Sequence, residues 1–225
     1  WLKHRLNEAK QAFRKKTLPA LSPAKLISYT HRRDARLARN SAELMEAVLI
    51  SLRRLQEKLH GRTPLAPFLW DLSDNGKSGR PKSEDRLTDF LKHHLEGDLP
   101  TFVIDREVQI RNLKEHGIGE RTDLKIEAKD HDGRSISVII ESKGCWNDGL
   151  MTAIQSQLYG RYLKLASEAC GIYLVGWFHC GRWEGKNNCV FKGTKEELFT
   201  ELNAKANLIN DGKARLNVFV LDATY

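Results

Sequence analysis

Two acidic residues and one lysine carry the chemistry that the sequence offers most plainly. Asp123 opens one apolar-rich run, and a second such run ends in Glu141, Ser142 and Lys143. Side chains alternate between the two faces of a strand, so Glu141 and Lys143 are expected to project together. Two carboxylates can hold a Mg²⁺ ion and leave room for water and phosphate oxygens. A lysine beside them can orient an attacking water or neutralise charge on a phosphate, so the trio indicates metal-assisted phosphodiester hydrolysis.

A hairpin would bring these residues together. The two runs lie within residues 121–143 and flank the pair Asp132 and Gly133. Asp-Gly between strand-like segments is a strong short-range signal for a β-hairpin. The sequence therefore predicts that Asp123 lies beside Glu141 at one end of a rigid sheet.

The Glu-x-Lys spacing alone is a weak signal, because the chain contains it three times. The three copies are Glu127/Lys129, Glu141/Lys143 and Glu184/Lys186. Only the second copy ends a β-branched apolar run that follows a strand bearing an Asp. The alternative for such a triplet is a surface ion pair at a strand end.

The residues around this triplet resemble the PD-(D/E)xK nucleases, the restriction-endonuclease-like superfamily. Asp123 matches the Asp of the family pattern, and Glu141–Lys143 matches its (D/E)xK triplet. Thr122 stands where the pattern has Pro, which is its loosest position. The resemblance covers roughly residues 81–225, and the order of the elements after the triplet also fits the family.

The resemblance implies an α/β fold, with a restriction-endonuclease-like central mixed β-sheet flanked by helices. It implies a metal-dependent endonuclease that hydrolyses phosphodiester bonds of DNA, with double-stranded DNA favoured. Asp123 and Glu141 would hold Mg²⁺, with Mn²⁺ as a substitute, and the main-chain carbonyl of Ser142 would be a third ligand. Lys143 would position or activate the attacking water. Such modules are often fused to an ATPase or sensor, so restriction or defence is the first expected role and repair the second.

The resemblance also suggests site residues on two predicted helices. Glu84 lies in the first turn of a helix that begins after Ser83, where the family often has a Glu that faces the metal. The alternative is that Glu84 only complements the helix dipole. Gln155 and Gln157 lie on a helix predicted from Leu150 to about Glu168. Gln155 stands four residues before Tyr159 and resembles a family Q-x-x-x-Y element, whereas Gln157, followed by Leu, is an equally good match to the family glutamine. The alternative is two solvent-exposed glutamines.

Four basic residues near the trio are candidates for contacts with nucleic acid. Arg111 and Lys114 belong to a polar loop after a predicted strand, and Arg121 follows that loop. Arg161 lies on the helix that carries the two glutamines. Contacts of this kind with phosphate oxygens position a protein on DNA without reading its sequence.

Positive charge is concentrated at the start of the chain. The formal net charge is +8, and residues 1–62 hold six Lys and nine Arg against five acidic residues. This part carries +10 and the remainder −2, an asymmetry that indicates a polyanionic partner such as nucleic acid. A solvated helical face is the alternative. We predict a basic helical segment over 1–62, a linker over 63–82 and the nuclease domain over 83–225.

Composition argues against several other classes. The chain is 40% apolar, and it contains neither a run of about eighteen apolar residues nor a signal-peptide pattern, so no membrane span is expected. Four cysteines in 225 residues do not indicate a disulfide framework, and we expect a reducing, cytoplasmic compartment. His179, Cys180 and Cys189 lack a fourth ligand at suitable spacing, which argues against zinc.

The chain begins at Trp1 and not at Met, so we expect it to be part of a larger protein with an upstream regulatory or ATPase region. A homo-oligomer is also compatible with the sequence. Two rival classes remain: a nucleic-acid-binding module that keeps the fold without cutting, and an assembly domain that uses residues 1–62 as a protein interface. The intact set of Asp123, Glu141 and Lys143 argues against both.

Overall fold

The computed structural model describes Arg5, Glu8 and residues 38–225, apart from residues 75 and 131 and the segments 112–119, 165–168, 185–188 and 211–213. The chain divides into two compact units, Trp1–Arg36 and Leu37–Tyr225. The second unit holds the sheet and the candidate site.

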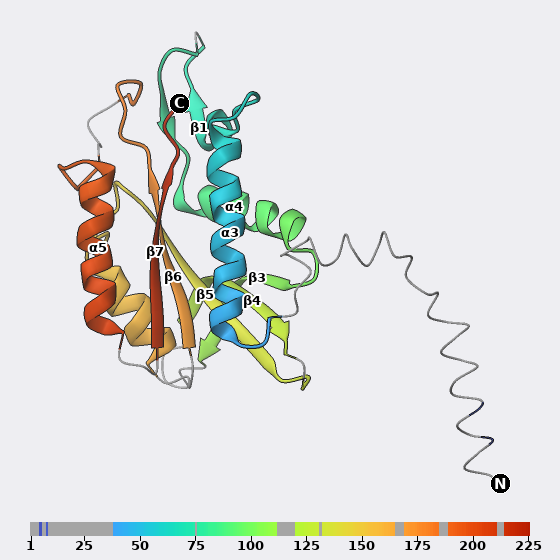
Figure 1. Cartoon of the computed structure of the whole chain (residues 1–225). Helices are drawn as coiled ribbons and strands as arrows, with labels where there is room; N and C mark the ends of the chain where they lie inside the picture. Colours follow the sequence, from blue (N-terminus) through green and yellow to red (C-terminus); the bar gives the residue numbers. More distant parts are fainter. Residues whose placement is uncertain are drawn as a thin grey trace. The chain divides into compact units, whose positions relative to one another are not determined.

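A five-stranded mixed sheet forms the centre of this unit, in the order β3-β4-β5-β6-β7. The strands are β3 (Val103–Arg111), β4 (Glu120–Lys129), β5 (Ser135–Gly144), β6 (Ala169–Trp177) and β7 (Ala214–Asp222). The β3–β4 and β4–β5 pairs are antiparallel, whereas β5–β6 and β6–β7 are parallel. The sheet, shown in Figure 1, confirms the predicted α/β class with a central mixed sheet.

The hairpin predicted at Asp132 and Gly133 joins β4 to β5. Gly133 has a φ of 80°, a conformation that residues with a side chain rarely adopt. The Asp130 carboxylate accepts hydrogen bonds from the main-chain amides of Asp132 and Arg134, at 2.9 and 2.8 Å. The turn is therefore closed by local contacts that the sequence itself encodes.

The parallel part of the sheet is its most buried part. Every residue of β6 is buried, and so is the second half of β5, from Val138 to Gly144. Continuous apolar runs of this kind are typical of strands that are covered on both faces. The triplet at the end of β5 therefore lies in the interior of the unit.

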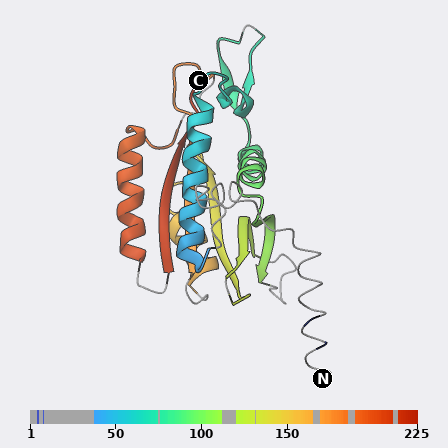
Figure 2. The same cartoon turned by 45° about the vertical axis from the view of Figure 1, so that its right-hand side comes forward.

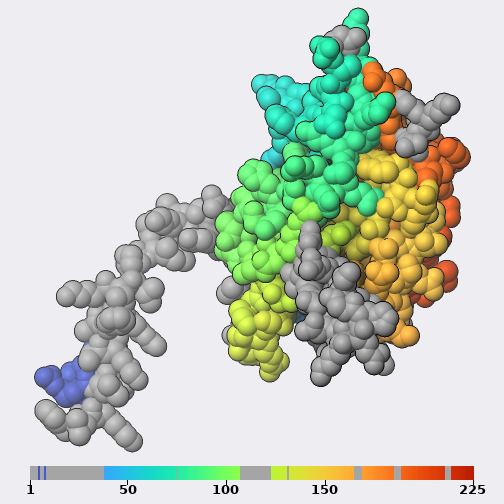
Figure 3. Space-filling model, turned by 180° about the vertical axis from the view of Figure 1, so that it is seen from behind, coloured from blue at the N-terminus to red at the C-terminus, as the bar shows by residue number. Residues whose placement is uncertain are grey.

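Helices pack on both faces of the sheet. They are α3 (Ser41–Leu59), α4 (Glu84–Asp98), the π-helix η3 (Ile154–Leu163) and α5 (Lys195–Ile209). α3 and α4 contact each other and β5, whereas α5 and η3 contact each other and pack on β7 and β6. Figure 1 shows α3 in front of the strands, Figure 2 shows α5 beside the edge strand β7, and Figure 3 shows the opposite side of the unit. Among the described residues, no helix has the length and apolar character that crossing a membrane requires.

α3 is part of this compact unit, whereas the sequence analysis placed it in a separate segment ending at residue 62. Its leucines at helical spacing, including Leu44, Leu52 and Leu59, are fully buried in the common core. An apolar stripe of this kind needs a partner surface, and the sheet provides it. The boundary between the two units lies at residues 36 and 37 instead. The structure does not describe most of the basic segment before it.

The stretch expected to be a linker, residues 63–82, is also folded. It contains the 3₁₀ helix η2 (Ala66–Leu69) and a two-stranded antiparallel sheet of β1 (Trp70–Leu72) and β2 (Gly79–Pro81). Trp70 is buried, and its indole Nε1 donates to the Ala223 carbonyl at 2.7 Å. The stretch predicted as a linker therefore contains a hairpin that an aromatic side chain anchors to the core.

Cys145 and Cys189 form a disulfide bond across 44 residues. The Cys145 carbonyl also accepts a hydrogen bond from the Val190 amide at 2.8 Å, so the two segments lie side by side. Within the described chain, Cys170 and Cys180 have free thiols. The number of cysteines predicted a reducing compartment, and this disulfide argues against that prediction.

Candidate active site

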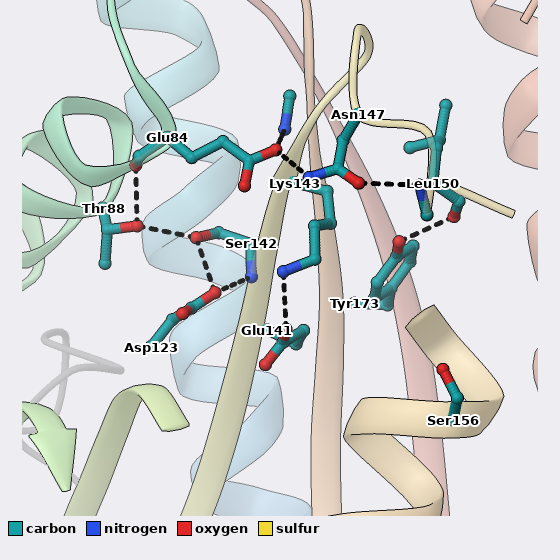
Figure 4. A network of polar contacts seen from close by, with 12 residues as sticks. Glu84, Thr88, Asp123, Glu141, Ser142, Lys143, Asn147, Leu150, Ser156 and Tyr173 are labelled. Atoms are coloured by element: carbon teal, nitrogen blue, oxygen red, sulfur yellow. Dashed lines mark hydrogen bonds and ion pairs between the residues drawn. The ribbon is translucent and has the colours of Figure 1, made fainter. Parts of the chain in front are cut away.

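Glu141 and Lys143 form a nearly buried ion pair at the carboxyl end of β5. Glu141 is 2% exposed and Lys143 is 8% exposed. The Lys143 ammonium donates to Glu141 Oε1 at 2.7 Å, as Figure 4 shows. The two side chains share a face, as strand alternation predicted. A surface ion pair, the alternative for this triplet, is therefore not what the structure shows.

Of the other two Glu-x-Lys triplets, the one that the structure describes in full does not show this arrangement. Glu127 pairs with Lys125 at 2.8 Å. Lys129 is exposed and donates to the Ser135 hydroxyl. In the third triplet, Lys186 lies outside the described residues.

Asp123 reaches the same end of the sheet from β4. The pairing of β4 with β5 extends to Leu124 opposite Ile140. Just beyond that pair, Asp123 Oδ2 accepts hydrogen bonds from the Ser142 amide at 2.8 Å and from the Ser142 hydroxyl at 3.1 Å. The carboxylate thus fixes β5 next to Glu141. The structure brings Asp123, Glu141 and Lys143 together, as the hairpin predicted.

The carboxyl group of Glu141 is electrostatically unusual. Burial, followed by the negative charge of Asp123, raises the pKa of Glu141 to about 7, although Lys143 and Arg161 oppose this shift. Glu141 Oε2 is buried and has no hydrogen-bond partner in the described structure. A buried acceptor without a donor is costly, so this oxygen is suited to bind a cation or a proton.

Lys143 is surrounded by acidic groups. Burial lowers the pKa of its ammonium, but the charges of Glu141, Asp123 and Glu84 raise it, and the net pKa lies above the usual value. Lys143 therefore stays charged at neutral pH. Three carboxyl groups around one ammonium give the site an excess of acidic groups and favour a further cation.

Glu84 borders the site from the first turn of α4. Its Oε1 accepts hydrogen bonds from the Gly144 amide at 2.9 Å and from Asn147 Nδ2 at 2.7 Å. The structure thus brings Glu84 to the trio and ties it to the chain just after Lys143. Sequence reasoning did not single out Asn147, for which the only signal is its place in the loop after the triplet.

Two tyrosines that sequence reasoning missed lie near the trio. Tyr173 pairs with Glu141 across β5 and β6, and its hydroxyl donates to the Leu150 carbonyl at 2.7 Å. Burial, followed by the charge of Glu141, raises the pKa of Tyr173 and raises that of Tyr162 to about 12. Both phenols therefore remain protonated at neutral pH. Their place in the site depends on strand register and helix packing, which the sequence does not encode locally.

The helix predicted after Leu150 contains η3, a π-helix that carries both candidate glutamines. Gln155 is exposed and Gln157 is half-buried. Neither side chain is hydrogen-bonded to the trio within the described part of the chain. The positive charge of Arg161, also on η3, lowers the pKa of Glu141. Arg161 is itself exposed, so it can meet a ligand at the edge of the site.

The remaining candidates for nucleic-acid contact cannot be placed as side chains. Arg111 ends β3 and Arg121 lies in β4, but only their main chains are described. Lys114 lies outside the described residues, as does most of the basic segment before residue 38.

The acidic groups suit a hard cation with few protein ligands. Among the described residues, no group of three or more His, Cys, Asp or Glu side chains has the arrangement of a metal site. Mg²⁺ needs less, because it commonly binds one or two carboxylates and keeps several waters. The carboxylates of Asp123 and Glu141, with the Ser142 carbonyl, fit that smaller requirement. Cys189, one of the residues considered for zinc, is held in the disulfide.

Comparison of the chain with protein-family models, with curated proteins and with solved structures found no match.

Proposed function

We propose that this chain is a metal-dependent endonuclease that hydrolyses phosphodiester bonds of DNA. The observation that carries the proposal is the buried Oε2 of Glu141, which has no hydrogen-bond partner among the described residues and lies beside Asp123 and the Lys143 ammonium. A purely structural ion pair between Glu141 and Lys143 gives no reason to place a second carboxylate, that of Asp123, next to Glu141. Perturbed carboxyl groups with a defined charge partner are typical of catalytic sites.

Asp123 and Glu141 would hold Mg²⁺, or Mn²⁺ in its place, and the Ser142 carbonyl would complete the protein ligands. A bound divalent ion of this kind polarises the phosphodiester and makes a water more acidic. Glu141 would bind the ion through Oε2, since its Oε1 accepts from Lys143. Glu84 is the third acidic candidate, although its Oε1 is already bonded to Gly144 and Asn147.

The Lys143 ammonium would position the attacking water and neutralise charge that develops on the phosphate. Its bond to Glu141 holds the ammonium in place before substrate arrives, so little reorganisation is needed during the reaction. The exposed guanidinium of Arg161 would contact a phosphate oxygen at the edge of the site. Gln155 and Gln157, on the same helix η3 as Arg161, are the remaining candidates for a catalytic role.

The partner proposed for the chain is DNA, with double-stranded DNA favoured. The basic segment supplies a charge-driven attraction that does not depend on base sequence. We further propose a role in restriction or defence in which an upstream regulatory or ATPase region controls cutting, with DNA repair as the second role.

A cleavage assay tests the proposal. Purified protein is incubated with plasmid DNA and Mg²⁺ or Mn²⁺, with EDTA as the metal-free control. Nicked or linear plasmid is expected with metal and is expected to disappear in Asp123→Asn and Glu141→Gln. Lys129→Ala is the matched control, because Lys129 has the same triplet spacing but lies exposed and apart from the trio. DNA binding without cleavage under all metal conditions would instead support the non-cutting module.

A further inference from the structure

Two side chains of α4 hold β5 on either side of Lys143. Glu84 Oε1 accepts from the Gly144 amide at 2.9 Å, and the Thr88 and Ser142 hydroxyls lie 2.7 Å apart. Thr88 is 3% exposed and Ser142 is 1% exposed, so the contact between the two hydroxyls is shielded from solvent. Figure 4 shows Thr88 and Ser142 on the side of β5 that is opposite to Glu141.

The geometry of a helix and a strand allows both contacts at once. Glu84 and Thr88 are four residues apart on α4, which corresponds to about 6 Å along a helix. Ser142 and Gly144 are two residues apart on β5, which corresponds to about 6.6 Å along a strand. One turn of α4 therefore matches one full period of β5, and Lys143 lies between the two fixed points.

A count of protons gives the hydroxyl contact a direction. Thr88 can donate to the Glu84 carbonyl at 2.9 Å or to Ser142, and Ser142 can donate to Asp123 Oδ2 at 3.1 Å. Two hydroxyl protons cannot serve three contacts fully. A hydrogen bond to a charged acceptor is the stronger one, so Ser142 donates to Asp123. Thr88 then donates to Ser142, and the chain of bonds runs from α4 to the carboxylate.

We propose that Thr88 is a positioning residue that sets the orientation of Asp123 and the place of Lys143 through Ser142. The inference rests on the proposed function for its catalytic meaning, although the hydrogen-bond chain exists without it. Thr88 would act as the outer partner of a metal-binding carboxylate. Outer partners of this kind fix the direction of a ligand's oxygen.

The alternative is that Thr88 is merely a buried hydroxyl that satisfies itself on its own helix. Thr200 on α5 does this, donating to the Glu196 carbonyl four residues earlier at 2.8 Å. Thr200 is exposed. Thr88 lies within reach of the equivalent contact, 2.9 Å from the Glu84 carbonyl, and in this alternative its proton would go there and not to Ser142. Thr200→Val is thus a matched control that removes only the helix contact.

The test uses the full chain, with Thr88→Val, Thr88→Ser and Thr200→Val. Mn²⁺ alone is titrated by calorimetry, and amide hydrogen exchange of Ser142 is measured separately in EDTA. Thr88→Val should weaken Mn²⁺ binding roughly 10-fold, the loss typical of an outer partner, and should speed exchange at Ser142. Thr88→Ser should preserve both properties because it keeps the hydroxyl, and Thr200→Val should match the wild type.

A second variant separates the hydrogen-bond chain from local packing. Ser142→Ala removes the middle hydroxyl and keeps the main chain, so it should weaken Mn²⁺ binding to a similar extent. The double variant with Ser142→Ala and Thr88→Val should bind Mn²⁺ no more weakly than the weaker-binding single variant. Both changes break the same chain of hydrogen bonds, so their losses should not add. Additive losses, or a failure of Thr88→Ser to preserve binding, would show that Thr88 acts only through packing.

The two proposals fail in different ways. Wild-type Mn²⁺ affinity and wild-type exchange at Ser142 in Thr88→Val would overturn the positioning role alone. A wild-type protein that binds no Mn²⁺ would overturn the proposed function. In that case, faster exchange at Ser142 in Thr88→Val would still establish that Thr88 holds the end of β5, and unchanged exchange would overturn that role as well.

Discussion

Lys143 donates to Glu141 at 2.7 Å, yet the pKa of Glu141 rises to about 7. A lysine at this distance would ordinarily lower the pKa of a carboxyl group. Burial of Glu141 and the nearby charge of Asp123 outweigh the lysine. Near neutral pH the protonated and the charged form of the Glu141 carboxyl group are therefore both populated.

Lys143→Ala should lower cleavage by roughly 10²-fold or more, the loss expected when a positioned electrostatic or acid–base group is removed. Lys143→Arg should restore little activity, because the planar guanidinium is larger and does not lose its proton. Single-turnover cleavage of labelled DNA measures both. Lys129→Ala should cleave like the wild type, and cleavage that survives Lys143→Ala but is lost in Lys129→Ala would point to the wrong triplet.

Stability should also depend on Lys143. Lys143 is 8% exposed, and its removal leaves the Glu141 carboxylate buried without its cation. The loss of unfolding free energy in Lys143→Ala should be larger at pH 8 than at pH 5, because Glu141 can take up a proton at the lower pH. Urea unfolding at both values measures this difference.

The raised pKa of Glu141 predicts a pH dependence of stability in the absence of metal. The folded-state pKa of about 7 lies above the ordinary value of 4.5, so the folded protein binds this proton more tightly. The contribution to stability is therefore present below pH 4.5 and is lost as the pH rises through 7. The difference is worth roughly 3 kcal/mol.

A glutamine at position 141 does not titrate, so Glu141→Gln should not lose this contribution. As the pH rises from 4.5 to 7, the stability of Glu141→Gln should therefore increase relative to that of the wild type. Urea unfolding in EDTA across this range provides the measurement. Lys143 remains charged throughout the range and does not obscure the comparison. If the unfolding free energies of the two proteins change in parallel with pH, the raised pKa of Glu141 would be contradicted.

The sequence predicts those parts of the site that depend on neighbouring residues. Asp132 and Gly133 specify the turn locally, and strand alternation places Glu141 and Lys143 on one face. Together they bring Asp123 to the triplet without any knowledge of the remaining fold. This explains why the trio follows from a reading of residues 121–143.

The contacts that complete the site come from distant segments and could not be predicted in this way. Thr88 and Asn147 gain their roles from the position of α4 against β5, and Tyr173 gains its place from the register of two parallel strands. In the sequence, α3 and the residues before it form one continuous run that is rich in leucines and cations. The packing of α3 on the sheet is what assigns this helix to the compact unit.

Reduction of the Cys145–Cys189 bond should destabilise the compact unit by about 2–4 kcal/mol, the usual contribution of a native disulfide. The bond links the residue after Gly144 to the segment before α5, so its loss frees a constraint in the unfolded chain. Urea unfolding with and without a thiol reductant measures the effect. Cys145→Ser should be insensitive to the reductant, whereas Cys180→Ser should respond as the wild type does. Equal stability of the reduced and oxidised wild type would argue against a structural role.

The last prediction concerns the basic segment, whose boundary the structure moves. Residues 1–36 contain five Lys and five Arg against two acidic residues, so they carry +8 and the compact unit after them is neutral overall. Deleting residues 1–36 should weaken DNA binding and flatten its salt dependence, because fewer cations displace counterions from phosphate. Deleting residues 1–62 would instead remove α3 and its buried leucines, and that protein should unfold.

Fluorescence anisotropy with labelled duplex DNA at several salt concentrations measures the affinity for DNA and the slope of its salt dependence. A full-length variant with Gln at the ten basic positions separates charge from chain length, and it should bind like the deletion. Wild-type affinity and slope in both variants would show that DNA contacts lie in the compact unit itself.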